Sequence, residues 1–201
     1  MTKVNTYSIK GTKLPAFTLP KGFEEKGSMN LLAQAIRVYE ARGHFGLAKA
    51  QTRAEVNRTK KKVYKQKGTG GARHGSRSAP IYVGGGKAHG PRPVERALHL
   101  PEKMRQKALK IALGLKVADG KVVFVSDLGK IKKTKEAQNL MDKIGAKGKV
   151  VFVLKGEVSK KPFINIRGSQ VIFYRDLNAY NAYLGGILIF DKAIFEKEAK
   201  K

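Results

Sequence analysis

The 201-residue sequence contains no cysteine, which excludes disulfide bonds, thiolate zinc sites and cysteine nucleophiles. It also has no run of about 18 apolar residues of the kind that spans a bilayer. The opening stretch, MTKVNTYSIKGTKLPAF, lacks the apolar centre of a secretory signal and the Arg- and Ser-rich pattern of a transit peptide. These absences predict a soluble, cytoplasmic protein with no membrane partner.

Acidic residues are scarce. The chain has 15 Asp and Glu against 42 Lys and Arg, a formal net charge of +27. A compact protein with this much self-repulsion generally relies on a polyanionic partner, for which nucleic acid is the first candidate and an anionic membrane the second. Hydrophobic residues still make up 41% of the chain, enough for a core elsewhere in the sequence.

Large apolar residues are also sparse within one segment, residues 42–96. This segment holds 14 Lys and Arg but only two acids, Glu55 and Glu95, together with ten of the 22 glycines. Its cations are interleaved with Gly, Ser and Thr, a pattern that favours a chain packed in RNA over a flexible linker. Glycine allows close backbone approach, and arginine offers a planar fork to phosphates.

The flanking sequence alternates between helical and strand patterns. Amphipathic spacing predicts helices at 28–42, 101–120, 134–146 and 177–186, a short helix or turn at 161–169, and a last helix capped by Asp191. Short runs rich in β-branched residues predict buried strands at 121–126, 149–154, 170–175 and 187–190. This alternation predicts an α/β fold with a parallel sheet and helices on its faces. The expected globular domain comprises 1–41 and 97–201, with 42–96 inserted as a long basic loop.

Motifs for enzymatic chemistry are absent or incomplete. In GTGGAR (68–73), Arg73 stands where a dinucleotide fingerprint needs its third glycine, and in GGGKAH (84–89) Ala88 follows the lysine where a phosphate loop needs Ser or Thr. The four histidines show neither ligand spacing nor a nearby carboxylate cluster. We therefore expect no catalytic residues, no metal and no cofactor.

An ordered set of motifs within residues 52–93 is more specific. TRAEV, QKGTG, AR-x-GS, GGG and GP-x-P follow one another over some forty residues, and together they closely resemble the hallmark segment of the universal large-subunit ribosomal protein four family in its bacterial form. One departure is Gly71, where that family usually has arginine. The resemblance extends over the whole chain, including FYRDLNAYNAYLGGILIFDKAIFEKE near its end.

The resemblance implies a three-layer α/β domain with a four-stranded, mostly parallel sheet and a basic loop that reaches inward through ribosomal RNA. It implies a structural protein of the large ribosomal subunit that binds rRNA early in assembly, contacts several rRNA domains and neighbouring ribosomal proteins, and meets the nascent peptide at the wall of the exit tunnel. The implied rRNA-binding residues are Arg53, Arg58, Lys60, Lys61, Lys62, Lys65, Gln66, Lys67, Gly68, Thr69, Gly70, Arg73, Ser76, Arg77, Lys87 and Arg92. The implied tunnel-lining residues are Gln66, Lys67, Gly68, Thr69, Gly70 and Gly71.

Two other functions remain as alternatives. A nucleotide-dependent α/β enzyme would need a phosphate loop after a strand and acid–base residues nearby, and the sequence offers neither. A basic RNA chaperone or translational repressor acting off the ribosome has the same composition as a ribosomal protein. Co-sedimentation with large subunits would separate these two RNA-binding roles.

Overall fold

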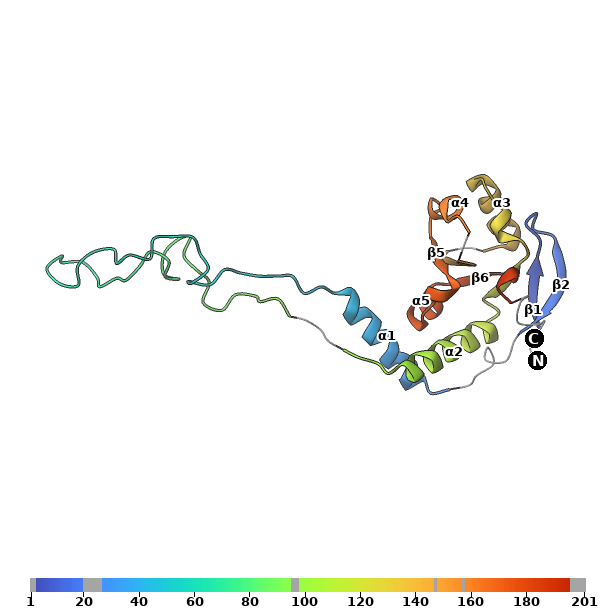
Figure 1. Cartoon of the computed structure of the whole chain (residues 1–201), viewed down its shortest axis with the longest axis horizontal. Helices are drawn as coiled ribbons and strands as arrows, with labels where there is room; N and C mark the ends of the chain where they lie inside the picture. Colours follow the sequence, from blue (N-terminus) through green and yellow to red (C-terminus); the bar gives the residue numbers. More distant parts are fainter. Residues whose placement is uncertain (1–2, 20–26, 95–97, 147, 157, 196–201) are drawn as a thin grey trace. The chain divides into compact units, whose positions relative to one another are not determined.

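A computed structural model of the chain describes residues 3–19, 27–94, 98–146, 148–156 and 158–195. It divides into two compact units (Figure 1). We call Met1–Glu40 together with His99–Lys201 the body, and Ala41–Leu98 the basic loop.

The body is built around one mixed sheet of six strands in the order β2-β1-β3-β6-β4-β5. Every neighbouring pair is parallel except β1 and β2, which form an antiparallel pair at one edge. The strands are β1 (Lys3–Tyr7), β2 (Lys13–Thr18), β3 (Val122–Val125), β4 (Val150–Leu154), β5 (Ser169–Phe173) and β6 (Ile187–Asp191). The α/β class and the mostly parallel sheet are therefore confirmed.

The predicted count of four strands is wrong, because the N-terminal pair β1 and β2 extends the sheet at one edge. The four expected strands correspond to β3 to β6. In β2 most residues are at least partly exposed and Pro15 removes one backbone donor, which is tolerated because this strand lies at the sheet edge. The β1–β2 register also shifts between Val4 and Thr6. The sequences of β1 and β2, KVNTY and KLPAFT, lack the continuous apolar run that predicted the four buried strands.

The helices follow the predicted positions, with ends shifted by a few residues. They are α1 (Met29–Gly43), α2 (Glu102–Ala118), α3 (Thr134–Ile144), α4 (Lys161–Ile164) and α5 (Ala179–Leu184). Gly145 ends α3 in the left-handed conformation, with φ 73°. The expected last helix is described only as a 3-10 turn, Lys192–Ile194, capped by the Asp191 carboxylate at 3.1 Å from the Ala193 amide. Its remainder, residues 196–201, lies outside the described residues.

Two hydrophobic clusters cover the two faces of the sheet. One joins α1, α2 and α5 to alternate strand residues such as Phe124 and Phe190, whose rings stack at 5.6 Å. The other joins α3 and α4 to the opposite face, where Phe152 lies 4.7 Å from Phe163. The body is thus a three-layer arrangement, and neither cluster includes a residue of the basic loop among those described.

Candidate nucleic-acid interface

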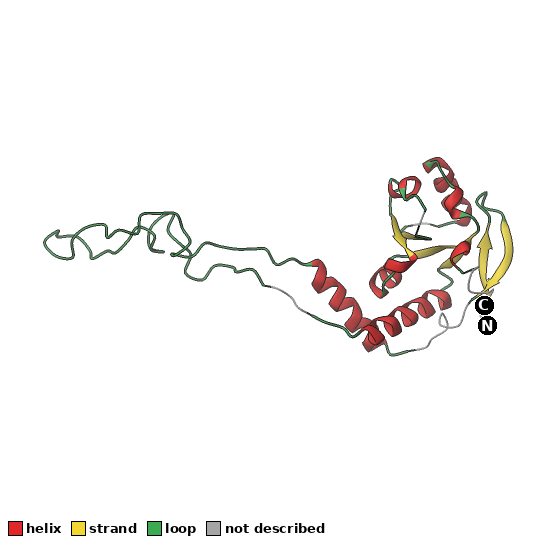
Figure 2. Cartoon of the chain, in the orientation of Figure 1, coloured by secondary structure: helices red, strands yellow, loops and turns green. Residues whose placement is uncertain are grey.

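The basic loop consists of two limbs, 41–65 and 72–98, and a tip, 66–71. Its described residues contain no strand and, beyond the end of α1, no helix (Figure 2). The limbs are nevertheless joined along their length by backbone hydrogen bonds. The donor–acceptor pairs are Val94 N to Gly46 O at 3.3 Å, Ala50 N to Pro91 O at 2.9 Å, Lys87 N to Gln51 O at 2.8 Å and Val63 N to Gly75 O at 2.9 Å.

Glycines allow this close approach of the limbs. A Cβ atom on Gly86 would lie 2.2 Å from the backbone nitrogen of Arg53, so only glycine fits against the opposite limb there. Gly46 has φ +60°, and a Cβ on it would lie 2.5 Å from the Val94 carbonyl oxygen. These glycines therefore place two lengths of backbone in contact where side chains would keep them apart.

A small aromatic cluster lies between the limbs near the tip. The ring of His74 is 6.2 Å from that of Tyr64 and 5.3 Å from that of Tyr82. The Tyr64 hydroxyl also donates a hydrogen bond to the Ala72 carbonyl oxygen. All three rings are partly buried, so they supply a modest apolar contact where the loop has few large side chains.

Three of the predicted RNA-binding cations also hydrogen-bond within the loop. Arg58 Nη1 donates to the Val83 carbonyl oxygen at 2.7 Å, and Lys60 Nζ to the Ala54 carbonyl oxygen at 3.2 Å. Lys62 Nζ donates to Gln66 Oε1 at 2.6 Å. Each cation remains exposed, so the remaining N–H donors stay available to a partner.

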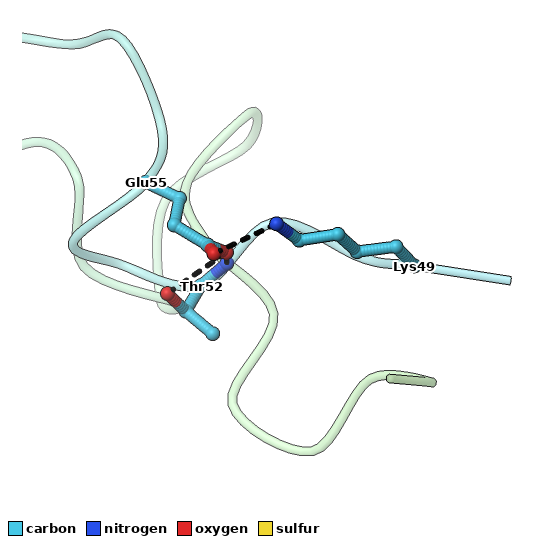
Figure 3. Close-up of polar contacts among 3 residues, drawn as sticks. All are labelled: Lys49, Thr52 and Glu55. Carbon is cyan, nitrogen blue, oxygen red and sulfur yellow. Dashed lines mark hydrogen bonds and ion pairs between the residues drawn. The ribbon is translucent and has the colours of Figure 1, made fainter. Parts of the chain in front are cut away.

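Glu55 is the one carboxylate among the described residues of the loop, and its contacts lie within the loop (Figure 3). It accepts from the Thr52 backbone amide at 2.9 Å and pairs with Lys49 Nζ at 3.0 Å. The hydrogen bond from the Thr52 backbone, followed by that from Lys49, lowers the pKa of Glu55 from 4.5 to about 2. The Glu55 carboxylate therefore holds a turn and leaves the charge of the other loop cations uncompensated.

The predicted site residues lie within this one unit. The cations among them are exposed, as are Gln66, Gly68, Thr69, Gly70 and Gly71 of the tip. Gly68 and Gly70 have φ of +82° and +65°, and a Cβ on Gly70 would meet no atom within 4 Å. Ser76 differs from the rest because it is 7% exposed.

Sequence reasoning missed Ser78, which is 2% exposed and shares a hydrogen bond of 2.8 Å with Ser76. The spacing Ser-x-Ser beside cations was the available signal. The burial and pairing of the two serines depend on the turn that they occupy, and the sequence pattern does not predict that turn.

Within the described residues, no three His, Cys, Asp or Glu side chains are grouped so that they could hold a metal ion. In the same part of the chain, no helix combines the length and apolar character needed to cross a membrane.

Comparison with known proteins gives a consistent result. Residues 17–201 match the sequence model of the ribosomal protein L4/L1 family. The large ribosomal subunit protein uL4 of Aquifex aeolicus is 36% identical over 184 residues, which cover 89% of this chain and 92% of that protein. The protein of the same name from Alkaliphilus metalliredigens is 34% identical over 203 residues, covering 99% and 96% of the two chains.

The family match extends over both units of the structure, the α/β body and the basic loop, and its relatives are named as proteins of the large ribosomal subunit. The chain belongs to the ribosomal protein L4/L1 family, as the match over residues 17–201 and the near full-length relatives show. It is thus a ribosomal protein and not an enzyme.

Proposed function

We propose that this protein is a structural constituent of the large ribosomal subunit, where it binds large-subunit rRNA early in assembly and contacts several rRNA domains. The observation that carries the proposal is the basic loop, in which the predicted cations are exposed and the single described carboxylate, Glu55, is paired internally. Such a surface attracts phosphates along its whole length. In the cytoplasmic ribosome, neighbouring ribosomal proteins would be further partners of this protein.

The length of the loop suits a role inside folded RNA. A limb of about 27 residues can span up to roughly 90 Å when extended at ~3.3 Å per residue. Its limbs are joined mainly through backbone groups and glycines, so the loop is thin as well as long. A thin, cationic segment can pass between RNA helices that would exclude a strand pair with large side chains.

The tip is the part that we propose to line the wall of the polypeptide exit tunnel and to meet the nascent peptide. Its residues, 66–71, are all exposed and include one cation, Lys67. Gly68 and Gly70 turn the backbone through positive φ without a side chain. The tip would thus give a thin wall with a single positive charge beside the passing chain.

Co-sedimentation tests the ribosomal role. The protein should sediment with large subunits in a sucrose gradient, and its affinity for isolated large-subunit rRNA should fall steeply as salt rises. A protein that stays at the top of the gradient, or a log-affinity against log-salt slope near zero, would contradict the proposal.

The tunnel assignment is tested separately by Lys67→Glu. The variant should still assemble into subunits, because most of the exposed cations are unchanged. Footprints of tunnel-binding macrolides on rRNA and release of a stalling peptide should both change, since the charge at the tip is reversed. Full incorporation with both measurements unaltered would show that the tip lies elsewhere.

A further inference from the structure

A shallow cavity of about 340 Å³ lies within the basic loop and has the lining of an anion site. Its lining residues are Arg53, Ala54, Lys60, Ser76 and Ser78, which come from three separate stretches of the loop. Two of them are cations and two are hydroxyls, and none is a carboxylate. This composition suits an oxyanion, for which arginine and hydroxyl donors are common partners.

Ser76 and Ser78 are both buried, whereas the predicted contact residues other than Ser76 are exposed. Ser76 is 7% and Ser78 2% exposed, and their hydroxyl oxygens lie 2.8 Å apart in a turn that the Ala79 amide closes on the Ser76 carbonyl at 3.3 Å. The bond between the hydroxyls uses one of their two protons. The other proton can be donated to a bound oxygen atom.

Backbone contacts fix the position of these groups before any ligand arrives. The Gly86 amide donates to the Ser78 carbonyl oxygen at 3.0 Å, while Gly86 also packs against the backbone of Arg53. Lys62 and Ser76 form an antiparallel bridge. Lys60 Nζ uses one of its donors on the Ala54 carbonyl, which holds the ammonium near the lining residues. The cavity is therefore built by the fold of the loop and not by chance crowding of side chains.

We propose that this cavity binds one phosphodiester group of RNA, with Arg53 and Lys60 supplying charge and the serine pair supplying a hydroxyl donor. The inference rests on the proposed rRNA-binding function and adds to it a single phosphate held by a fixed set of donors. The other predicted cations of the loop are exposed and do not line this cavity. Arg77 is the clearest contrast, since it stands between the two serines in sequence but is exposed and does not line the cavity.

A phosphodiester fits the site better than free inorganic phosphate. The cavity is open to the surface of the loop, so a phosphate can enter while its ribose and neighbouring nucleotides remain outside. Exposed cations on both limbs, such as Lys61 and Lys87, can attract other phosphates of the same RNA. A free ion would gain none of these additional contacts.

Phosphate ethylation interference on large-subunit rRNA tests the proposal with the full-length protein. We expect ethylation at a limited set of phosphates to block binding of the wild-type protein. At one of these phosphates, ethylation should no longer weaken binding of Arg53→Gln or of Ser78→Ala. Each variant should also lose about tenfold in affinity, the scale of one hydrogen bond to a charged group. Arg77→Gln is the matched control: it removes the same charge as Arg53→Gln, weakens binding through charge, and should keep the interference at that phosphate.

The outcomes distinguish the cavity proposal from the proposed function. If the wild type binds rRNA but both cavity variants show the same interfering phosphates as the wild type, the cavity proposal is overturned while the proposed function stands. If inorganic phosphate shifts the amide NMR signals of Ser76 and Ser78 and the interference pattern is still unchanged, the site takes a free ion and the RNA assignment is overturned. If the wild type does not bind rRNA at all, the cavity proposal and the proposed rRNA-binding function are both overturned. Arg53 is exposed, so Arg53→Gln keeps the test valid even if Ser78→Ala disturbs folding.

Discussion

At the scale of single residues, one charged group in the loop and one in the body have a pKa that their surroundings lower. Glu55 is exposed but bonded to Thr52 and Lys49, whereas Lys116 is 7% exposed and donates to the Gly186 carbonyl oxygen at 3.0 Å. Burial first, and then the charge of Lys121, lower the pKa of Lys116 from its ordinary 10.5. One group therefore reports on the loop and the other on the body.

The titration of Glu55 shows whether the turn at Thr52 forms without RNA. In the free protein its carboxyl should have a pKa of about 2, and its contribution to the turn should be complete above pH 4.5 and lost as the pH falls toward 2. Lys49→Gln should raise the pKa only in part, because the Thr52 backbone bond is the larger cause. NMR titration of the Glu55 side chain gives the measurement, with the urea-unfolded protein as control. A pKa near 4.5 in the free protein would show that the turn is not formed.

Lys116 should make the body more stable as the pH rises toward 10.5. Its pKa is lowered in the folded state, so the unfolded state binds more protons between the two values and the free energy of unfolding increases with pH. Lys116→Met should remove this part of the slope. Chemical denaturation at several pH values measures it, with Lys107→Met, an exposed lysine on the same helix α2, as control. Equal slopes for both variants would contradict this effect of burial.

At the scale of elements, the contact between the limbs depends on glycine at particular positions. Gly86 lies against the backbone of Arg53 and donates to Ser78. Gly75, by contrast, does not have a positive φ, and a Cβ added to it would meet no atom within 4 Å. The same substitution therefore has different consequences at the two sites.

Gly86→Ala should separate the limbs, whereas Gly75→Ala should leave them joined. In the first variant the amide of Lys87 should lose its protection from hydrogen exchange, because its acceptor on Gln51 moves away. The affinity for rRNA should fall about tenfold, since one hydrogen-bonded set of donors to phosphate is lost. Hydrogen exchange and a binding titration on both variants make the comparison. Equal protection of Lys87 in the two would show that the limbs are not held by this contact.

The strands and the limbs of the loop also differ in how well the sequence predicts them. The runs VVFV and VVFVL mark β3 and β4 because strands buried on both faces are apolar at every position. The edge strands β1 and β2 lack that signal. In the loop, four of the hydrogen bonds between the limbs join backbone atoms, and no side-chain pattern in the sequence predicts them. The cations of the site were predictable from composition and motifs, but the buried pair of Ser76 and Ser78 depends on a turn that only the three-dimensional structure reveals.

At the scale of the whole molecule, the hydrophobic core lies in the body, and the net positive charge per residue is highest in the basic loop. The clusters that stabilise the sheet draw only on the body among the described residues, and the segment 42–96 adds 14 Lys and Arg. Stability and RNA affinity should therefore respond to different parts of the chain.

Replacing residues 42–96 with a short Gly/Ser linker should leave a folded body. Both hydrophobic clusters are retained, so thermal unfolding should stay cooperative with a midpoint within a few degrees of the full chain. Binding to rRNA should become weak and depend less on salt, because most phosphate contacts are removed. Calorimetry tests the prediction on unfolding, and a salt titration of rRNA binding tests the prediction on affinity. Loss of a cooperative transition would mean that the loop belongs to the core.

The position of β6 in the sheet has a consequence for the order in which the protein is made. This strand, Ile187–Asp191, lies between β3 and β4, although it follows both of them in sequence. During synthesis, β3 and β4 therefore wait for their shared neighbour until nearly all of the chain has left the ribosome, while the basic loop has emerged long before. We expect the loop to become available to RNA while the sheet is still open, so that capture of this protein by its partner can begin before its own folding is complete.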